Sequence, residues 1–131
     1  MDESYEQSTE LQPCILSAGT LCGDPVVNPS GEDLGRVEEL MIDLDDGRVA
    51  YAVLSFGGFM GIGNKLFAIP FEALELDSEN HRFILDTPRE KLEAAPGFDK
   101  DDWPDFADPG FGRELYGYYG VPTYRETRRN P

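Results

Sequence analysis

The run from Val49 to Phe56 constrains the fold most, because it is apolar at nearly every position. A strand with this pattern has to be covered on both of its faces. We expect a closed barrel to cover one face, and a C-terminal tail or a second subunit to cover the other. The uncharged stretch 49–64 contains four glycines and is shorter than the roughly 18–20 residues of a membrane-spanning helix, so no transmembrane segment is predicted.

Short apolar runs separated by turn residues extend on both sides of this strand, from about residue 16 to residue 92, and this alternation is typical of β-structure. Further strands are expected over residues 21–27, 34–44, 65–69 and 82–86. Five or six short strands without strand–helix–strand alternation predict an all-β fold, a small barrel.

Turn residues indicate where these strands end. Asn28-Pro29-Ser30-Gly31 is expected to close the first strand. Asp46-Gly47 is expected to form a tight hairpin with a primed turn, which needs residues tolerant of positive φ. A bulge at Glu38-Glu39 would keep the apolar residues on both sides of it facing the core. Pro70 lacks an N–H group and predicts an edge strand or a bulge.

One short helix is predicted after the barrel. Thr87 stands where its hydroxyl can cap the first turn, Pro88 takes the first helical position, and Glu90 can reach back to the cap. Pro96-Gly97 should end this helix within about two turns.

Composition divides the chain into three parts. Residues 1–15 predict a disordered acidic arm, residues 16–96 a barrel domain, and residues 97–131 an extended acidic and aromatic tail. Because disordered segments are poor in aromatic residues, we expect the tail to dock, either over its own barrel or on a second subunit or foreign partner. Its aromatic residues are Phe98, Trp103, Phe106, Phe111, Tyr116, Tyr118, Tyr119 and Tyr124.

The charge balance disfavours polyanionic partners. Eleven basic residues stand against 26 acidic ones, for a net charge of -15. Nucleic acid and anionic membrane surfaces would be repelled, so neither is expected as a partner. The start of the sequence has no basic region followed by an apolar run, which predicts a cytoplasmic protein.

The residues that could carry catalysis form no recognisable set. Cys14 and Cys22 match the spacing of neither a redox pair nor a zinc knuckle. Free thiols are expected in a reducing cytoplasm, with a local or intersubunit disulfide as the alternative. His81 is expected in a solvated polar turn, and no serine or cysteine has the context of a nucleophile. We therefore expect no enzymatic activity, no cofactor and no metal site.

The glycine-rich loop between Gly57 and Lys65 does not match a phosphate-binding loop. Asn64 interrupts the required glycine–lysine pair, and Leu66 stands where that motif has a hydroxyl. The glycines allow a sharp turn, and the apolar residues of the loop should cap one end of the barrel or contact a partner. These residues are Phe59, Met60 and Ile62.

Two acidic runs could bind a cation. The run from Asp43 to Gly47 begins like a calcium loop but lacks the distal glutamate, so a hairpin turn explains it. The run from Asp99 to Asp108 has five aspartates among prolines and aromatics, which predicts a solvated tail, with weak cation binding as the alternative.

Several short segments resemble the PRC-barrel family in their order along the chain. They are Asp24-Pro25-Val26-Val27-Asn28, Gly31, Leu34-Gly35-Arg36-Val37, Ile42-Asp43, the glycine loop from Gly57 to Lys65, Ala68-Ile69-Pro70-Phe71 and Leu74. This barrel is shared by the H subunit of photosynthetic reaction centres, a ribosome maturation factor and stand-alone bacterial proteins. The resemblance implies an all-β barrel and a non-catalytic, protein-docking role.

From the residues and the resemblance together we expect a non-enzymatic protein-binding or scaffolding module that associates with itself. The alternative is a small-ligand or cation-responsive sensor that uses the acidic tail. The hypothesised partner contacts are Phe59, Met60, Ile62, Trp103, Tyr116, Tyr118 and Tyr119.

Overall fold

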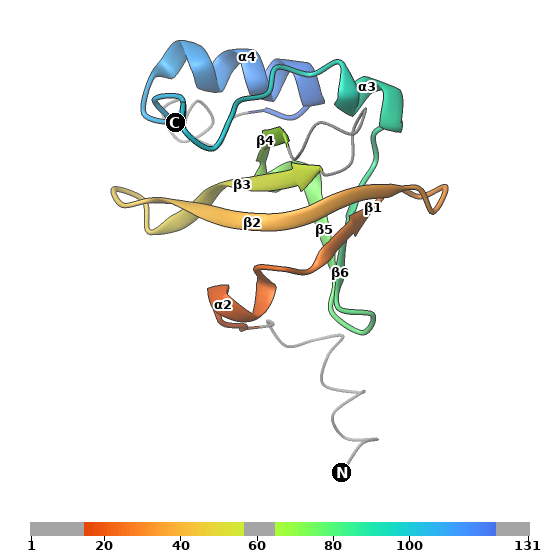
Figure 1. Cartoon of the computed structure of the whole chain (residues 1–131). Coiled ribbons are helices and arrows are strands. Elements are labelled where there is room, and N and C mark those ends of the chain that lie inside the picture. The colour runs from red at the N-terminus through yellow and green to blue at the C-terminus, as the bar shows by residue number, and fades with distance from the viewer. Residues whose placement is uncertain (1–14, 57–64, 123–131) are drawn as a thin grey trace.

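The computed structural model describes residues 15–56 and 65–122, and its centre is one curled six-stranded sheet (Figure 1). The strand order is β4-β3-β2-β1-β6-β5. The strands are β1 (Pro25–Val27), β2 (Asp33–Asp43), β3 (Arg48–Phe56), β4 (Lys65–Pro70), β5 (Leu74–Asp77) and β6 (Arg82–Leu85). The prediction of a mostly-β fold with five or six strands is confirmed, although the described sheet is a half-barrel with β4 and β5 as its edges.

Short helices surround the sheet. They are α2 (Ala18–Leu21), the 3-10 helix η2 (Phe71–Ala73), α3 (Arg89–Glu93) and α4 (Pro109–Tyr119). Figure 1 shows α3 and α4 on one side of β2 and β3, with α2 on the other side. None of the described helices is long and apolar enough to cross a membrane.

One parallel pairing stands among the antiparallel ones of the sheet. Strand β1 pairs with β2 in antiparallel fashion and with β6 in parallel fashion, through Val26 opposite Phe83. The short β1 therefore joins the long β2–β3–β4 meander to the β5–β6 hairpin, and the two parts enclose the core between them.

The predicted strands agree with the observed ones except at the first, and no strand was predicted at β5. Leu21, expected to begin the first strand, is instead the last residue of α2, and the strand starts only at Pro25. The reason is local, because the side chain of Ser17 accepts a hydrogen bond from the backbone N–H of Thr20 at 3.1 Å and so caps a helical turn.

The predicted bulge is confirmed and the predicted turn type is wrong. Val37 pairs with Leu54 and Glu39 with Val53, which leaves Glu38 as the extra residue. The β2–β3 connection is a four-residue turn, Leu44–Gly47, in which Gly47 alone has a positive φ, of +66°.

The side chain of Asp43 explains this turn. Its Oδ1 atom accepts hydrogen bonds from the backbone N–H groups of Asp45 and Asp46, at 3.0 and 3.3 Å. A carboxylate that bonds to the backbone two and three residues later stabilises a wider turn than the two-residue primed type.

The predicted cap of α3 also differs. Pro88 has an extended ψ of 147° and occupies the N-cap position, and no side chain bonds to the first turn. Thr87 is buried, and its carbonyl accepts a hydrogen bond from the side chain of Asn28. The helix ends before Pro96, as expected.

The expectation of a single helix followed by an extended aromatic tail is confirmed only in part, because residues Pro109–Tyr119 of that tail form α4. Asp108 caps its start by accepting from the backbone N–H of Gly110 at 3.0 Å, and proline occupies the first turn. Gly120 ends the helix in the left-handed region, with φ at +74°.

Apolar side chains fill the space enclosed by the sheet. Gly35 permits the close crossing of β2 over β3, because its φ is +108° and a Cβ there would lie 2.4 Å from the carbonyl oxygen of Ser55. The buried cluster comprises Val26, Leu34, Val37, Leu54, Phe56, Phe67, Ile69, Phe83, Leu85, Leu92 and Ala95.

Candidate docking surface

The chain covers the outer face of its own β3 and β4. Tyr51, on that face, is 5% exposed and lies at the centre of a ring cluster. Its ring centroid is 5.5 Å from that of Phe106 and 5.9 Å from those of Phe111 and Tyr116. The segment after α3 thus supplies the second cover that the doubly apolar strand requires, and for residues 97–122 docking is within the chain.

The same segment pairs with the edge of the sheet at β4. The backbone N–H of Leu66 donates to the carbonyl of Phe98 at 3.0 Å, and the N–H of Phe98 donates back at 2.8 Å. Gly97 allows this approach, since a Cβ there would meet the Lys65 side chain at 2.8 Å and the Leu66 carbonyl at 3.0 Å. This backbone pairing therefore covers part of the β4 edge, which could otherwise pair with a strand of another chain.

Four of the residues predicted to contact a partner are described in the structure. Three of them pack within the chain instead. Tyr116 is 4% exposed and its hydroxyl donates to the carbonyl of Ala50 at 3.5 Å. Tyr118 and Tyr119 are half-buried against the main core cluster. Trp103 is the exception, with 38% of its surface exposed. The other predicted contacts, Phe59, Met60 and Ile62, lie outside the described residues.

The two neighbouring tyrosine hydroxyls differ in their surroundings. The Tyr118 hydroxyl donates to the carbonyl of Lys91 at 2.6 Å. The Tyr119 hydroxyl is buried and has no hydrogen-bond partner among the described residues. Burial raises the pKa of Tyr119 well above its usual range, with a smaller contribution from the charge of Tyr118.

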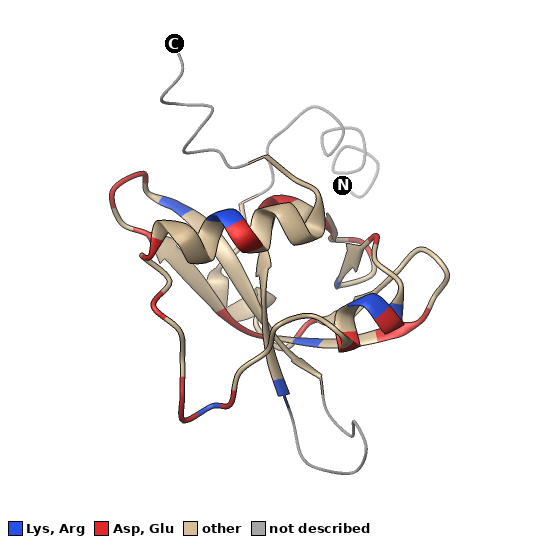
Figure 2. Ribbon diagram, turned by 90° about the horizontal axis from the view of Figure 1, so that it is seen from above, with Lys and Arg blue, Asp and Glu red and all other residues tan. Residues whose placement is uncertain are grey.

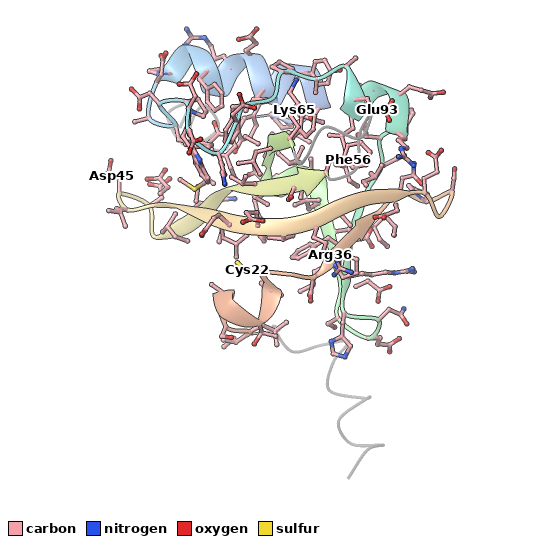
Figure 3. All side chains as sticks on the ribbon, viewed as in Figure 1. Cys22, Arg36, Asp45, Phe56, Lys65 and Glu93 are labelled. Carbon is pink, nitrogen blue, oxygen red and sulfur yellow. The ribbon has the colours of Figure 1, made fainter. Side chains whose placement is uncertain are left out.

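Apolar residues that the sequence analysis did not single out are exposed at the β2–β3 hairpin. Leu44 is 87% exposed and Ile42 is 49% exposed. Ile42 pairs across the hairpin with Val49, which is half-buried. We call Ile42, Leu44 and Val49 the hairpin patch. Figure 3 shows Asp45 at the tip of this hairpin, far from Phe56 at the other end of β3.

The residues of the hairpin patch belong to neither of the two buried clusters of the described chain. Met41 and Ile42 are consecutive residues of β2, so their side chains face opposite sides of the sheet. Met41 packs under the C-terminal segment, whereas Ile42 faces the opposite side, where no described element covers it. Exposed aliphatic side chains grouped in this way mark contact surfaces more often than isolated ones do.

The acidic runs form no described cation site. Within residues 15–56 and 65–122, no group of three or more His, Cys, Asp or Glu side chains could hold a metal ion. Carboxylates of the tail bond to the backbone instead, since Asp105 accepts from the N–H of Ala107 and Asp108 from that of Gly110. The cation-responsive alternative remains a prediction without a ligand set in the described chain.

Cys22 and His81 have ordinary structural surroundings. Partial burial raises the pKa of the Cys22 thiol, and the negative charges of Glu39 and Glu38 raise it further. The thiolate is therefore disfavoured, which is the reverse of what a nucleophilic cysteine needs. Figure 3 shows Cys22 on the α2 side of β2. His81 is exposed in the turn between β5 and β6, as expected, with a positive φ of 54°.

The model of the PRC-barrel domain family matches residues 15–92. This span includes all six strands and α3 up to Leu92, and it excludes α4. No curated protein matches the chain.

Proposed function

Because this chain belongs to the PRC-barrel domain family, we propose that it is a non-enzymatic protein-docking module. The family supports a protein-interaction or scaffold role. The enclosed space of the half-barrel holds the large side chains of Phe67, Phe83 and Leu34, each almost fully buried. A filled interior favours function at the surface over chemistry in a pocket.

The observation that carries the proposal is the exposure of the hairpin patch. Leu44 is 87% exposed, so its side chain contributes almost no burial energy to the stability of the fold. A polar residue would stabilise a solvated turn equally well. Contact with another protein would bury Leu44 together with Ile42. The docking surface proposed for this module is therefore the end of the β2–β3 hairpin.

The more specific proposal is that this surface contacts a second copy of the chain. The second apolar face of β3 was a reason to expect self-association from the sequence, but it no longer supports it, because α4 and the segment before it cover that face. The hairpin patch supports it instead. Burying Leu44 and half of Ile42 from each of two copies contributes on the order of 6 kcal/mol.

That contribution favours a weak dimer. Association costs roughly 4–15 kcal/mol in lost translational and rotational freedom, so two hairpin patches alone give at most a concentration-dependent complex. The net charge of -15 opposes contact, but at physiological salt the Debye length is about 8 Å and distant repulsion is damped. The absence of nucleic-acid binding, which rests on this charge, and a cytoplasmic location both remain predictions.

Light scattering between about 1 and 500 μM, at physiological salt, tests this function. The wild-type chain should pass from monomer to dimer over this range, and the double variant Ile42→Ser/Leu44→Ser should remain monomeric. The matched control is Ile15→Ser/Leu16→Ser, which removes exposed apolar side chains elsewhere and should dimerise like the wild type. A wild-type chain that is monomeric throughout would refute self-association.

A further inference from the structure

A second surface is independent of the hairpin patch and lies on the segment between α3 and α4. Trp103 packs against Phe98 with ring centroids 5.2 Å apart, and against Phe106 at 6.1 Å. Phe98 and Phe106 are themselves 6.2 Å apart, so the three rings contact one another. We call this group the Trp103 platform. Its outermost member remains 38% exposed.

The platform is attached to rigid parts of the fold. Phe98 is held by its two backbone hydrogen bonds to Leu66 on β4. Phe106 packs on the buried ring of Tyr51, at 5.5 Å. Trp103 is thereby oriented before any ligand arrives, which lowers the entropic cost of using it for binding.

Several aspartates lie close to Trp103 along the chain. Residues Asp99 to Asp108 contain five aspartates and one lysine, a formal charge of -4. Asp99, Asp101, Asp102 and Asp105 are exposed and lie within four residues of Trp103 along the chain. Figure 2 shows the acidic positions along this segment, interrupted by the single basic position of Lys100.

We propose that the Trp103 platform binds an arginine-rich segment of a partner protein. Guanidinium groups stack on tryptophan faces through cation–π attraction, and their planar N–H donors match carboxylates in pairs. A partly exposed tryptophan in a segment of formal charge -4 offers both complements. Arginine is favoured over lysine, because the ammonium group is more strongly hydrated and does not stack.

This proposal extends the docking role without using the hairpin patch. It accounts for an exposed tryptophan in an acidic segment, which intramolecular packing alone does not require. The charge that disfavours nucleic acid as a partner favours a basic protein segment, and the field of the whole chain would speed the encounter.

The test uses the full-length chain and a fluorescein-labelled nona-arginine peptide, with nona-lysine as the second probe. Binding is followed by peptide anisotropy and by the emission of Trp103, the single tryptophan of the chain. Nona-arginine should bind saturably and shift the Trp103 emission, and should bind at least about threefold more tightly than nona-lysine.

Variants separate the platform from the general charge of the protein. The quadruple variant Asp99→Asn/Asp101→Asn/Asp102→Asn/Asp105→Asn should bind nona-arginine at least about tenfold more weakly. The control variant removes four other exposed carboxylates and should change affinity less than twofold after correction for net charge. It is Glu38→Gln/Glu39→Gln/Glu75→Gln/Glu79→Gln.

Two single variants sharpen the result. Trp103→Ala should weaken anisotropy-detected binding about fivefold. Lys100→Gln leaves the rings unchanged and removes the one opposing charge, so it should strengthen binding. Far-UV circular dichroism and the melting temperature confirm that each variant folds.

Three outcomes would overturn the proposal. They are an equal loss of affinity in the control quadruple variant, equal binding of nona-lysine and nona-arginine, or an unchanged Trp103 emission on saturation. Each indicates general electrostatic attraction to an acidic protein. The hairpin variant Ile42→Ser/Leu44→Ser should bind nona-arginine like the wild type, so a failure of self-association leaves this test intact.

Discussion

Gly112 of α4 lies directly against the hydroxyl group of Tyr51 on β3: a Cβ atom at position 112 would stand 2.9 Å from that oxygen. This contact sets how closely the helix approaches the sheet. Tyr51 is held by three other rings and cannot turn aside without disturbing them. The helix lies outside the residues matched by the family, yet it completes the cover of the family's sheet.

A pair of glycine variants in α4 tests this packing. Gly112→Ala should lower the free energy of unfolding by about 1–3 kcal/mol, because the added methyl group overpacks the Tyr51 ring. Gly117→Ala is the matched control on the same helix, with nothing within 4 Å of its Cβ position. It should raise stability by up to about 1 kcal/mol through helix propensity. Urea denaturation measures both, and equal effects would contradict the packing.

The two tyrosines at the end of α4 should respond differently to loss of the hydroxyl. Tyr118→Phe removes the hydrogen bond to the Lys91 carbonyl and should cost about 0.5–1.5 kcal/mol. Tyr119→Phe removes a buried hydroxyl without a described partner and should be neutral or stabilising. A larger cost for Tyr119→Phe than for Tyr118→Phe would contradict the assignment.

The raised pKa of Tyr119 also predicts a pH dependence. A group whose folded pKa exceeds its unfolded value contributes stability that is complete below the unfolded pKa, about 10 for tyrosine, and is lost as pH rises toward the folded pKa. Stability should therefore fall above about pH 10, and the fall should be smaller in Tyr119→Phe. The free energy of unfolding is measured by urea denaturation at each pH. An equal fall above pH 10 in the wild type and in Tyr119→Phe would contradict this effect.

Asn28 joins the β1–β2 turn to the start of α3. Its side-chain nitrogen donates to Glu32 at 2.7 Å and to the carbonyl of Thr87 at 3.2 Å. Asn28→Asp replaces this buried donor with an acceptor beside a carboxylate, and should cost at least about 2 kcal/mol at pH 7.

The deficit of Asn28→Asp should shrink in acid. The introduced carboxyl group would have a folded pKa above its unfolded value, so its penalty is absent below the unfolded pKa and grows as pH rises through the folded one. Denaturation at pH 3 and pH 7 measures the change. Asn80→Asp is the comparison at an exposed site: its side chain also donates to a carboxylate, that of Asp77 at 2.8 Å, but water screens the charges there, so its deficit should be smaller. A pH-independent deficit at position 28 would count against the network.

Removal of the C-terminal segment should expose the sheet. A chain ending at Pro96 loses the rings that cover Tyr51 and the backbone pairing at Leu66. We expect a lower melting temperature and new association through the bared face and edge. A chain ending at Pro122 retains these contacts and should behave like the full chain. Equal stability of the two truncations would show that the segment is not needed as a cover.

Much of the sheet could be predicted because turn chemistry is local. Asn28-Pro29-Ser30-Gly31 closes β1, with the N–H of Gly31 bonded to the carbonyl of Asn28 at 2.9 Å, and Glu38 forms the expected bulge. Because β3 is apolar on both faces, the sequence correctly predicted that both of its faces would be covered. These features depend on residues within a few positions of one another.

Helix α4 could not be predicted from propensity. It contains three glycines and four aromatic residues, all weak helix formers, so its composition indicated an extended tail. Tertiary packing decides otherwise, since Gly112 is needed to fit Tyr51 and Tyr116 is needed to cover it. The local signals that could have revealed the helix were Asp108-Pro109 at its start and Gly120 at its end.

The hairpin patch was missed for a different reason. The sequence pattern predicts Leu44 as the last residue of a strand. In the structure Leu44 lies in the wider turn that the Asp43 side chain stabilises, and this turn leaves it exposed. Strand alternation fixes which side of the sheet Ile42 faces, but its exposure depends on which elements of the folded chain cover that side. The exposure of Trp103 likewise follows from which of its neighbours pack inward, a property of the folded chain.

The proposed docking surface is tested most directly by amide chemical shifts of the ¹⁵N-labelled chain as its concentration rises from about 10 to 500 μM, at physiological salt. We expect concentration-dependent shifts confined to the hairpin, from Ile42 to Val49, and their absence in Ile42→Ser/Leu44→Ser. Residues of β5 and β6 serve as internal controls. Hairpin shifts that stay constant over this range, or changes centred on another part of the chain, would contradict the account.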